Sequence, residues 1–197
     1  MKRQERGSTP LDDFSGLIPK HVRTQEDLNL AEFENISAVL TKYFLKKPSG
    51  KKAPFNLEWF RKLHKEMYGC VWKWAGEIRK TELSIGIKAH QIVHELHRLQ
   101  VELKKWEEQG DDALMIAAKL HHRLVWIHPF QGGNGRWARM ASNIFLYKKD
   151  LSLVEWPEDE ARVESGFRKQ YLEALKAADA GDLDPVISLH RTHWKRS

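Results

Sequence analysis

One segment of the chain combines residue types that could bind a polyphosphate. His128 precedes Pro129, and residues 131–139 then contain three glycines, one asparagine and two arginines. Because proline disfavours the helical conformation in the residue before it, a preceding helix should end at His128 and turn the imidazole outward. The glycines permit backbone conformations in which successive N–H groups point into one concavity. The segment therefore predicts an anion site with a histidine at its rim.

The residues after the glycines are expected to begin a helix that points at the same anion. Residues 137–147 have the apolar spacing of a helix, and the positive end of its dipole would face the ligand. Arg136 and Arg139 lie on one face of the first turn, where each guanidinium group can donate paired hydrogen bonds to phosphate oxygens. The expected phosphate-binding residues are Gly133, Asn134, Gly135, Arg136 and Arg139.

The same string resembles the signature HPFx[D/E]GNGRxxR of Fic-domain proteins. It departs from the signature at Gly132, where the family usually carries an acid. Two further strings, GLIPKH at residues 16–21 and ALKAADAGD at residues 174–182, resemble a Fic subgroup called mobile mystery protein B. The matching signature positions are His128, Pro129, Phe130, Gly133, Asn134, Gly135, Arg136 and Arg139.

The resemblance implies an all-α, Fic-type helical bundle with one short β-hairpin, the flap, and the activity of a protein adenylyltransferase. In such an enzyme His128 would be the catalytic base that takes the proton from a Ser, Thr or Tyr hydroxyl of a target protein. The hydroxyl would attack the α-phosphorus of ATP, and the two arginines would neutralise charge on the leaving pyrophosphate. The implied partners are the target protein and an antitoxin or other regulatory protein.

Gly132 weakens the expected metal site. The acid that the family usually carries there holds Mg²⁺ against the phosphates, so no metal ligand is assigned and a weakened nucleotidyltransferase is expected. Mg²⁺ often needs only one carboxylate besides phosphate oxygens and water, so ATP could still deliver a weakly held ion. Two alternatives stay open. One is a Fic-fold protein that transfers another phosphate-containing group or removes AMP; the other is a non-catalytic nucleotide-binding or DNA-associated regulator.

An earlier string extends the resemblance to the flap. Residues 74–79 read WAGEIR, and residues 78–87, which contain β-favouring side chains between glycines, are expected to form a short hairpin. The resemblance implies that this hairpin aligns the main chain of a target by strand addition. Its target-binding residues would be Leu83, Ser84 and Ile85.

A second earlier string resembles an inhibitory helix of some Fic proteins. Residues 30–35 read LAEFEN, against the motif [S/T]xxxE[G/N], with a leucine in the place of Ser or Thr. The inhibitory glutamate would be Glu34, or with a poorer fit Glu32, and it would pair with Arg139. The alternative interpretation makes both glutamates solvated surface charges.

Apolar residues at helical spacing recur through most of the chain and would position this site. Thr24, with Asp27 three residues later, predicts the N-terminal cap of the first helix. We expect an extended arm over residues 1–24 and one domain over residues 25–197, with the signature loop at residues 128–139. The predicted helices cover residues 25–44, 57–68, about 90–106, 113–127, 137–147, a stretch after residue 157 to about 180, and 185–193.

Three histidines offer a separate metal hypothesis. His90, His94 and His97 are spaced so that one helix face could present three imidazoles to a zinc ion. The spacing is not the HExxH pattern and no acidic partner is assigned, so a polar helix with ordinary histidines is the default interpretation.

Composition favours a folded domain and argues against two classes of protein. Of the 197 residues, 41% are hydrophobic and 30% charged, which fits a packed core rather than disorder. The net charge of +6 gathers at residues 2–6, 46–52 and 195–196, which argues against a specific nucleic-acid surface. Cys70 is the single cysteine and cannot form an internal disulfide, which favours a reducing compartment. No apolar run is long enough for a membrane span or signal peptide. We therefore expect a cytoplasmic location.

Overall fold

The computed structural model describes residues 15–157 and 165–195. These residues form an α-helical bundle, which confirms the all-α prediction; most of the expected N-terminal arm, residues 1–14, lies outside them. None of the helices in the described ranges is both long and apolar enough to cross a bilayer. The helices are α1 (Gln25–Phe44), α2 (Leu57–Tyr68), α3 (Ile92–Glu108), α4 (Ala113–Ile127), α5 (Asn134–Lys148), α7 (Gly166–Asp179) and α8 (Asp184–His193), with a 3-10 turn η1 (Ala89–Gln91) before α3.

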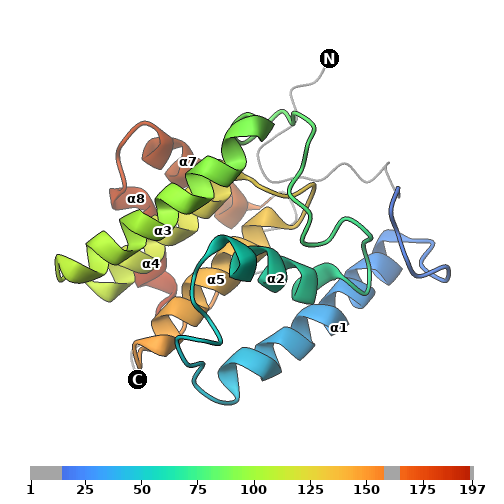
Figure 1. Cartoon of the computed structure of the whole chain (residues 1–197), viewed down its shortest axis with the longest axis horizontal. Helices are drawn as coiled ribbons and strands as arrows, with labels where there is room; N and C mark the ends of the chain where they lie inside the picture. The colour runs from blue at the N-terminus through green and yellow to red at the C-terminus, as the bar shows by residue number, and fades with distance from the viewer. Residues whose placement is uncertain (1–14, 158–164, 196–197) are drawn as a thin grey trace.

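Helices α4 and α5 pack against each other at the centre of the bundle (Figure 1). Helices α3, α7 and α8 pack on α4, while α2 packs on α5 and α1 lies against α2. Helix α5 begins at Asn134, three residues earlier than its apolar spacing predicts. Its Trp137 is fully buried, and the indole N–H donates to the Phe60 carbonyl of α2 at 3.1 Å, so the polar end of this large side chain is satisfied.

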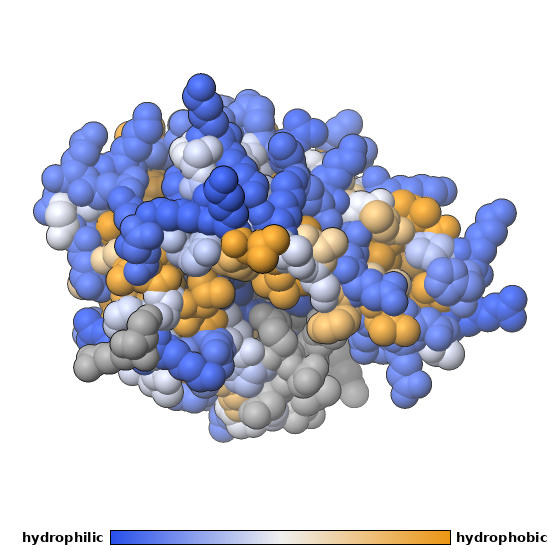
Figure 2. Space-filling model, turned by 90° about the horizontal axis from the view of Figure 1, so that it is seen from below, coloured by the Kyte–Doolittle hydropathy of each residue, from blue (hydrophilic) through white to orange (hydrophobic). Residues whose placement is uncertain are grey.

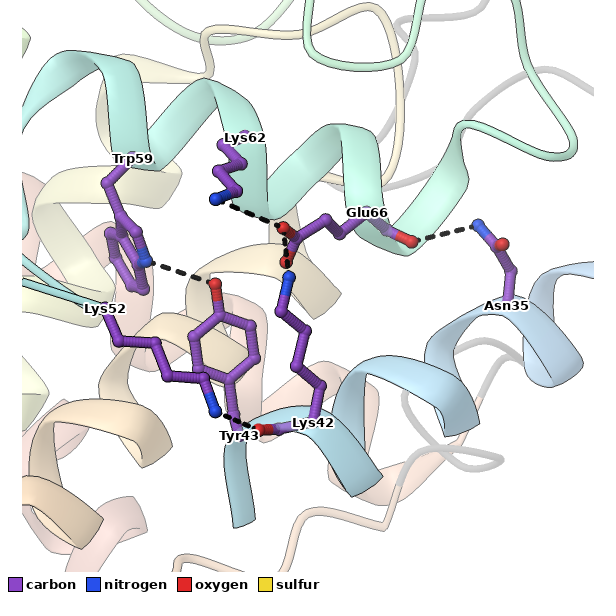
Figure 3. A network of polar contacts seen from close by, with 7 residues as sticks. All are labelled: Asn35, Lys42, Tyr43, Lys52, Trp59, Lys62 and Glu66. Atoms are coloured by element: carbon purple, nitrogen blue, oxygen red, sulfur yellow. Dashed lines mark hydrogen bonds and ion pairs between the residues drawn. The ribbon is translucent and has the colours of Figure 1, made fainter. Parts of the chain in front are cut away.

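Helix α1 is fixed on the bundle by its caps and by polar contacts with α2. Thr24 caps its start as predicted, and Asp27 completes a capping box by accepting from the Thr24 N–H. Figure 3 shows contacts along its second half, where Lys42 Nζ lies 2.5 Å from Glu66 Oε1 and the Asn35 amide donates to the Glu66 carbonyl at 3.2 Å. Tyr43 Oη accepts from the Trp59 indole at 3.3 Å, and burial raises the pKa of Tyr43 to about 12. These contacts hold the inner face of α1 toward the signature loop.

The solvent-exposed face of α1 carries large apolar side chains among its polar ones. Leu30, Phe33 and Leu40 are exposed there, opposite the buried Leu28 and Val39. Figure 2 views the molecule from below Figure 1, the side on which α1 lies, and shows hydrophobic patches interrupted by hydrophilic residues. Because apolar residues lie on both the buried and the exposed face, the sequence of α1 is only weakly amphipathic.

The predicted hairpin is wrong. Residues 78–87 are all described, and they form an irregular loop without strand pairing. The physical reason is that carbonyl groups at both ends of the loop, those of Thr81 and Ile87, accept from the guanidinium group of Arg79. A side chain therefore joins the two arms of the loop where the prediction placed a backbone ladder.

Candidate active site

His128 ends α4 as predicted, but its imidazole does not lie at an open rim. Its backbone is left-handed, with φ of 51° and ψ of 61°, and its N–H donates to the Leu124 carbonyl at 3.1 Å. A non-glycine residue in such a sparsely populated conformation costs about 1–3 kcal/mol, so the surrounding contacts must hold it there. His128 is only 7% exposed, and Gly86 of the loop formed by residues 78–87 packs on its Cβ and Cγ. The side chain is therefore mostly buried, with its root against this loop.

The turn that follows is held by Asn134. Its side-chain oxygen accepts from the Phe130 N–H at 3.0 Å, and its side-chain nitrogen donates to the Phe130 carbonyl at 2.9 Å. Gly133 has a φ of 72°, and a Cβ there would lie 2.6 Å from the ring of Tyr68, so only glycine fits. Asn134 is 2% exposed, which means that its amide is engaged inside the loop.

The first signature arginine is paired with α1. Arg136 Nη2 lies 2.6 Å from Glu32 Oε2, and its guanidinium carbon lies 5.1 Å from the centre of the Tyr68 ring. The other oxygen of Glu32 accepts from the Trp72 indole at 2.8 Å, and Glu32 is 7% exposed. This carboxylate therefore occupies a donor that a phosphate group could use.

The pairing of Glu34 with Arg139 that the resemblance implied is wrong, and the alternative interpretation, a solvated surface charge, holds for Glu34 but not for Glu32. Glu34 is exposed on α1, whereas Glu32, the poorer match to the motif, lies on the buried face with Leu28 and Val39. Two residues correspond to about 200° of rotation around a helix, so the two glutamates cannot face the loop together. Helical phase, rather than agreement with the motif, decides which glutamate reaches an arginine, and the arginine reached is Arg136.

The second signature arginine lies in an aromatic setting. Arg139 is 5% exposed, its Nη1 is 3.4 Å from Tyr171 Oη, and its guanidinium carbon is 5.5 Å and 5.9 Å from the rings of Tyr171 and Trp156. A Cβ on Gly135 would lie 3.4 Å from Arg139 Nη1, so the glycine leaves room for the guanidinium group. Tyr171 Oη also lies 3.0 Å from His121 Nε2, and burial holds the pKa of His121 well below its usual value. A neutral histidine and a tyrosine from α7 thus support this arginine.

Part of the chain matches a known protein family. The model of the Fic/DOC family matches residues 54–146, which contain the signature loop, α2, α4 and most of α5. The chain carries a Fic/DOC family domain. A curated relative, protein adenylyltransferase Fic of Drosophila grimshawi, is 30% identical over 142 residues, which are 70% of this chain and 28% of the relative. The chain thus spans less than a third of that relative's length.

Solved structures share the arrangement of the Fic domain. Fic-1 from C. elegans superimposes with a TM-score of 0.70 at 23% identity, covering 91% of this chain and 52% of that one. The N-terminal Fic domain of a Bartonella quintana effector protein, solved with bound ADP, gives a TM-score of 0.69 at 18% identity and covers 95% and 94% of the two chains. At these identities the similarity establishes the fold, including the helices α7 and α8 that lie outside the family match.

Sequence reasoning missed His64, a buried residue that supports the signature loop. Its Nδ1 accepts from the Gly76 N–H at 3.0 Å, so Nε2 carries the proton and donates to the Gly132 carbonyl at 3.0 Å. The ring stacks on Phe130 with centroids 3.7 Å apart, and burial lowers the pKa of His64 to about 3. The available signal was its position one turn after Phe60, on the apolar face of the helix predicted at residues 57–68.

Acidification is expected to destabilise the Fic domain through His64. The folded protein holds this residue neutral. Its contribution to the unfolding free energy is therefore complete above pH 6.5 and is lost as the pH falls from 6.5 toward about 3. The slope is about 1.4 kcal/mol per pH unit, which predicts a loss of about 2 kcal/mol in unfolding free energy between pH 6.5 and pH 5. Urea unfolding of the wild type and of His64→Gln at both pH values measures the share of His64, because burial also lowers the pKa of His121 and of His190.

The matched variants for this prediction are His64→Gln and His94→Gln. His64→Gln should be less stable at neutral pH but should respond less to acid, while His94 is exposed and its variant should follow the wild type. An identical acid response in the wild type and His64→Gln would show that another group is responsible.

The Fic domain shows no ligand set for a metal ion among the described residues, where no three His, Cys, Asp or Glu side chains gather suitably. His90, His94 and His97 are each exposed, so they do not form the hypothesised zinc site. At the signature loop Gly132 supplies no carboxylate, and Glu32 is engaged by Arg136 and Trp72. The side chains around the loop therefore do not fit a protein-held Mg²⁺.

Proposed function

We propose that this protein is an adenylyltransferase that moves AMP from ATP to a Ser, Thr or Tyr hydroxyl of a target protein. One observation carries the proposal: a single loop joins a histidine in strained left-handed backbone to a helix N-terminus that bears two arginines. The Drosophila grimshawi relative, which shares 30% identity with this chain over 142 residues, is a protein adenylyltransferase by name, and this supports the proposal. The bound ADP of the Bartonella quintana structure supports a nucleotide as the substrate.

In the proposed reaction His128 is the catalytic base. It accepts the proton of the target hydroxyl while the hydroxyl oxygen forms a bond to the α-phosphorus of ATP. The bond between the α-phosphorus and the bridging oxygen breaks, and pyrophosphate leaves with the electron pair. The proton on His128 then passes to solvent, which restores the base.

The phosphates would lie against the start of α5. The first N–H groups of a helix lack intrahelical acceptors, so Asn134, Gly135 and Arg136 can offer main-chain donors together with Gly133. The guanidinium groups of Arg136 and Arg139 would supply charged donors where negative charge gathers on the leaving group. No step is assigned to Mg²⁺, because Gly132 provides no ligand for it.

We also propose that α1 restrains this activity. Glu32 holds the guanidinium group of Arg136 at 2.6 Å, so a phosphate must displace this carboxylate before it can use that donor. The contacts of Glu66 with Lys42 and Asn35 keep α1 in place and thereby keep Glu32 in position (Figure 3).

Glu32→Ala is therefore expected to raise AMP transfer. Removing the carboxylate frees a charged hydrogen-bond donor worth about 1.5–3 kcal/mol, which predicts an increase of about tenfold or more at subsaturating ATP. The measurement is the rate of radiolabel incorporation from α-labelled ATP. Glu34→Ala is the matched control, because Glu34 lies two residues away on the exposed face of α1. Equal rates for the two variants would contradict an inhibitory role of Glu32.

The decisive test of the reaction uses the position of the label. Purified protein is incubated with ATP labelled at either the α- or the γ-phosphorus, with Mg²⁺ and a lysate as the source of targets, and modified peptides are identified by mass spectrometry. AMP transfer retains only the α label and adds one AMP. Retention of the γ label would indicate transfer of a different phosphate group, and loss of AMP from a premodified target would indicate de-AMPylation. Nucleotide binding without either product would favour the non-catalytic regulator.

We propose that residues 25–197 act as one domain preceded by an arm, and that the chain belongs to the mobile mystery protein B subgroup. Leu83, Ser84 and Ile85 are proposed to contact the main chain of the target, although their loop contains no strand in this structure. A cytoplasmic location, on the basis of the single Cys70, and an antitoxin or regulatory partner complete the proposal.

A further inference from the structure

Arg79 is a buried arginine whose donors go to main-chain carbonyl groups. Its side chain has no exposed surface. Its Nε donates to the His128 carbonyl at 2.8 Å, Nη1 donates to the Thr81 carbonyl at 2.9 Å, and Nη2 donates to the Ile87 carbonyl. The main-chain N–H of Arg79 also donates to the Pro129 carbonyl at 2.9 Å. One residue thus binds both ends of the loop at residues 81–87 and both residues that open the signature.

Burying a cation of this kind costs free energy through desolvation, so we ask what the geometry of the guanidinium group provides in return. Burial lowers the pKa of Arg79, and its acidic neighbour Glu82 is 3.9 Å away with a side chain that is 62% exposed. An ion pair with so exposed an acid does little to offset the desolvation of the guanidinium group. What arginine offers here is a planar fork that reaches three carbonyl groups in fixed directions, which neither lysine nor glutamine can do.

A second observation ties the same loop to the imidazole. Gly86 has a φ of 86°, and a Cβ at this position would lie 2.4 Å from the Cβ of His128 and 3.3 Å from its Cγ. The loop backbone therefore rests directly on the root of the His128 side chain. Loop, arginine and histidine move as one unit if these contacts hold.

We propose that Arg79 is a positioning residue that sets the register between the target-binding loop and the base His128. Through Thr81 and Ile87 it shapes the loop against which the target's main chain would lie, and through the His128 carbonyl it fixes the peptide that carries the imidazole. The inference rests on the proposed function, because it assigns a purpose to this register. Since these contacts do not involve the side chains of Arg136 and Arg139, Arg79 should govern turnover rather than ATP binding.

The test compares Arg79→Lys with a matched variant, Arg61→Lys. Arg61 also donates from Nε to a loop carbonyl, that of Gly76 at 3.1 Å, but it does not contact His128 in this way. Because a displacement of about 1 Å can cost about 100-fold in rate, Arg79→Lys is expected to lower kcat by about 10- to 100-fold. The KM for ATP should stay within about twofold, and Arg61→Lys should match the wild type in both. A fall in ATP affinity with unchanged kcat, or equal effects of both variants, would overturn the proposal.

Two further measurements keep the proposal testable if Arg79→Lys folds poorly or the wild type is inactive. Gly86→Ala retains Arg79 in the sequence, but its Cβ would lie 2.4 Å from the His128 Cβ and 3.1 Å from Arg79 Nη2. The loop must therefore shift relative to both residues, and the same loss of kcat is expected. The ring resonances of His128, followed by NMR across a pH titration, should change in Arg79→Lys and Gly86→Ala but not in Arg61→Lys. Unchanged His128 resonances in folded Arg79→Lys would refute the positioning role. Changed resonances in a protein that never transfers AMP would instead refute the proposed reaction.

Discussion

His128→Ala is expected to abolish AMP transfer while ATP binding persists. A positioned general base contributes about 10²- to 10⁴-fold to a rate, and no other imidazole is held at the start of the glycine loop by left-handed backbone in the described part of the chain. The substitution leaves Arg136, Arg139 and the first amides of α5 in place, so the affinity for ATP should change by less than about threefold. Single-turnover labelling with α-labelled ATP measures the first quantity, and titration calorimetry measures the second.

The control for this prediction is His94→Ala, which removes an exposed imidazole from α3. It should behave as the wild type in both measurements. Residual AMP transfer above about one hundredth of the wild-type rate in His128→Ala would mean that a different group accepts the proton. Loss of ATP binding together with activity would mean instead that His128 supports the loop rather than the chemistry.

Arg139→Ala is expected to weaken the use of ATP by about 10- to 150-fold in kcat/KM. The range corresponds to about 1.5–3 kcal/mol for a charged hydrogen bond to a phosphate group. The effect should appear in kcat/KM even for Arg139→Lys, because lysine keeps the charge but loses the fork. Steady-state labelling at several ATP concentrations measures it.

Arg191→Ala, which removes an exposed arginine from α8, controls for the loss of positive charge. A surface variant such as Lys169→Ala serves the same purpose for a lysine. Both should stay within about twofold of the wild type, since exposed charges are screened by solvent and salt. Equal losses in Arg139→Ala and in either control would indicate a general effect of net charge and would remove the assigned role.

The sequence predicted the bundle well because most of its helices carry apolar periodicity, and a cap residue marks the start of the weakly amphipathic α1. The bounds of α1, α2 and α4 and the N-cap at Thr24 agree with the structure. The loop at residues 78–87 was predicted wrongly, because its β-favouring side chains are a local signal. The shape that forms depends on Arg79 near the start of this loop, whose guanidinium group donates to the Thr81 and Ile87 carbonyls and so joins the two arms.

The sequence identified most residues of the site but not the contacts that they make. The signature identifies His128 and the arginines, but long-range contacts decide what covers them: Glu32 from α1, Gly86 from the loop and Tyr171 from α7. Motif agreement favoured Glu34, and only the phase of α1 against the bundle shows which glutamate faces inward. His64 gave no signal as a chemical group, because its role comes from a buried, neutral ring.

The left-handed backbone of His128 bears on how the unknown target could be captured. Asparagine tolerates this conformation better than most residues, and its amide cannot take up a proton at neutral pH. A His128→Asn protein would keep the end of α4 and its contact with Gly86, yet leave the hydroxyl of a docked substrate unreacted. Target and nucleotide would then remain together on the enzyme, and chemical crosslinking could recover the complex from a cell extract.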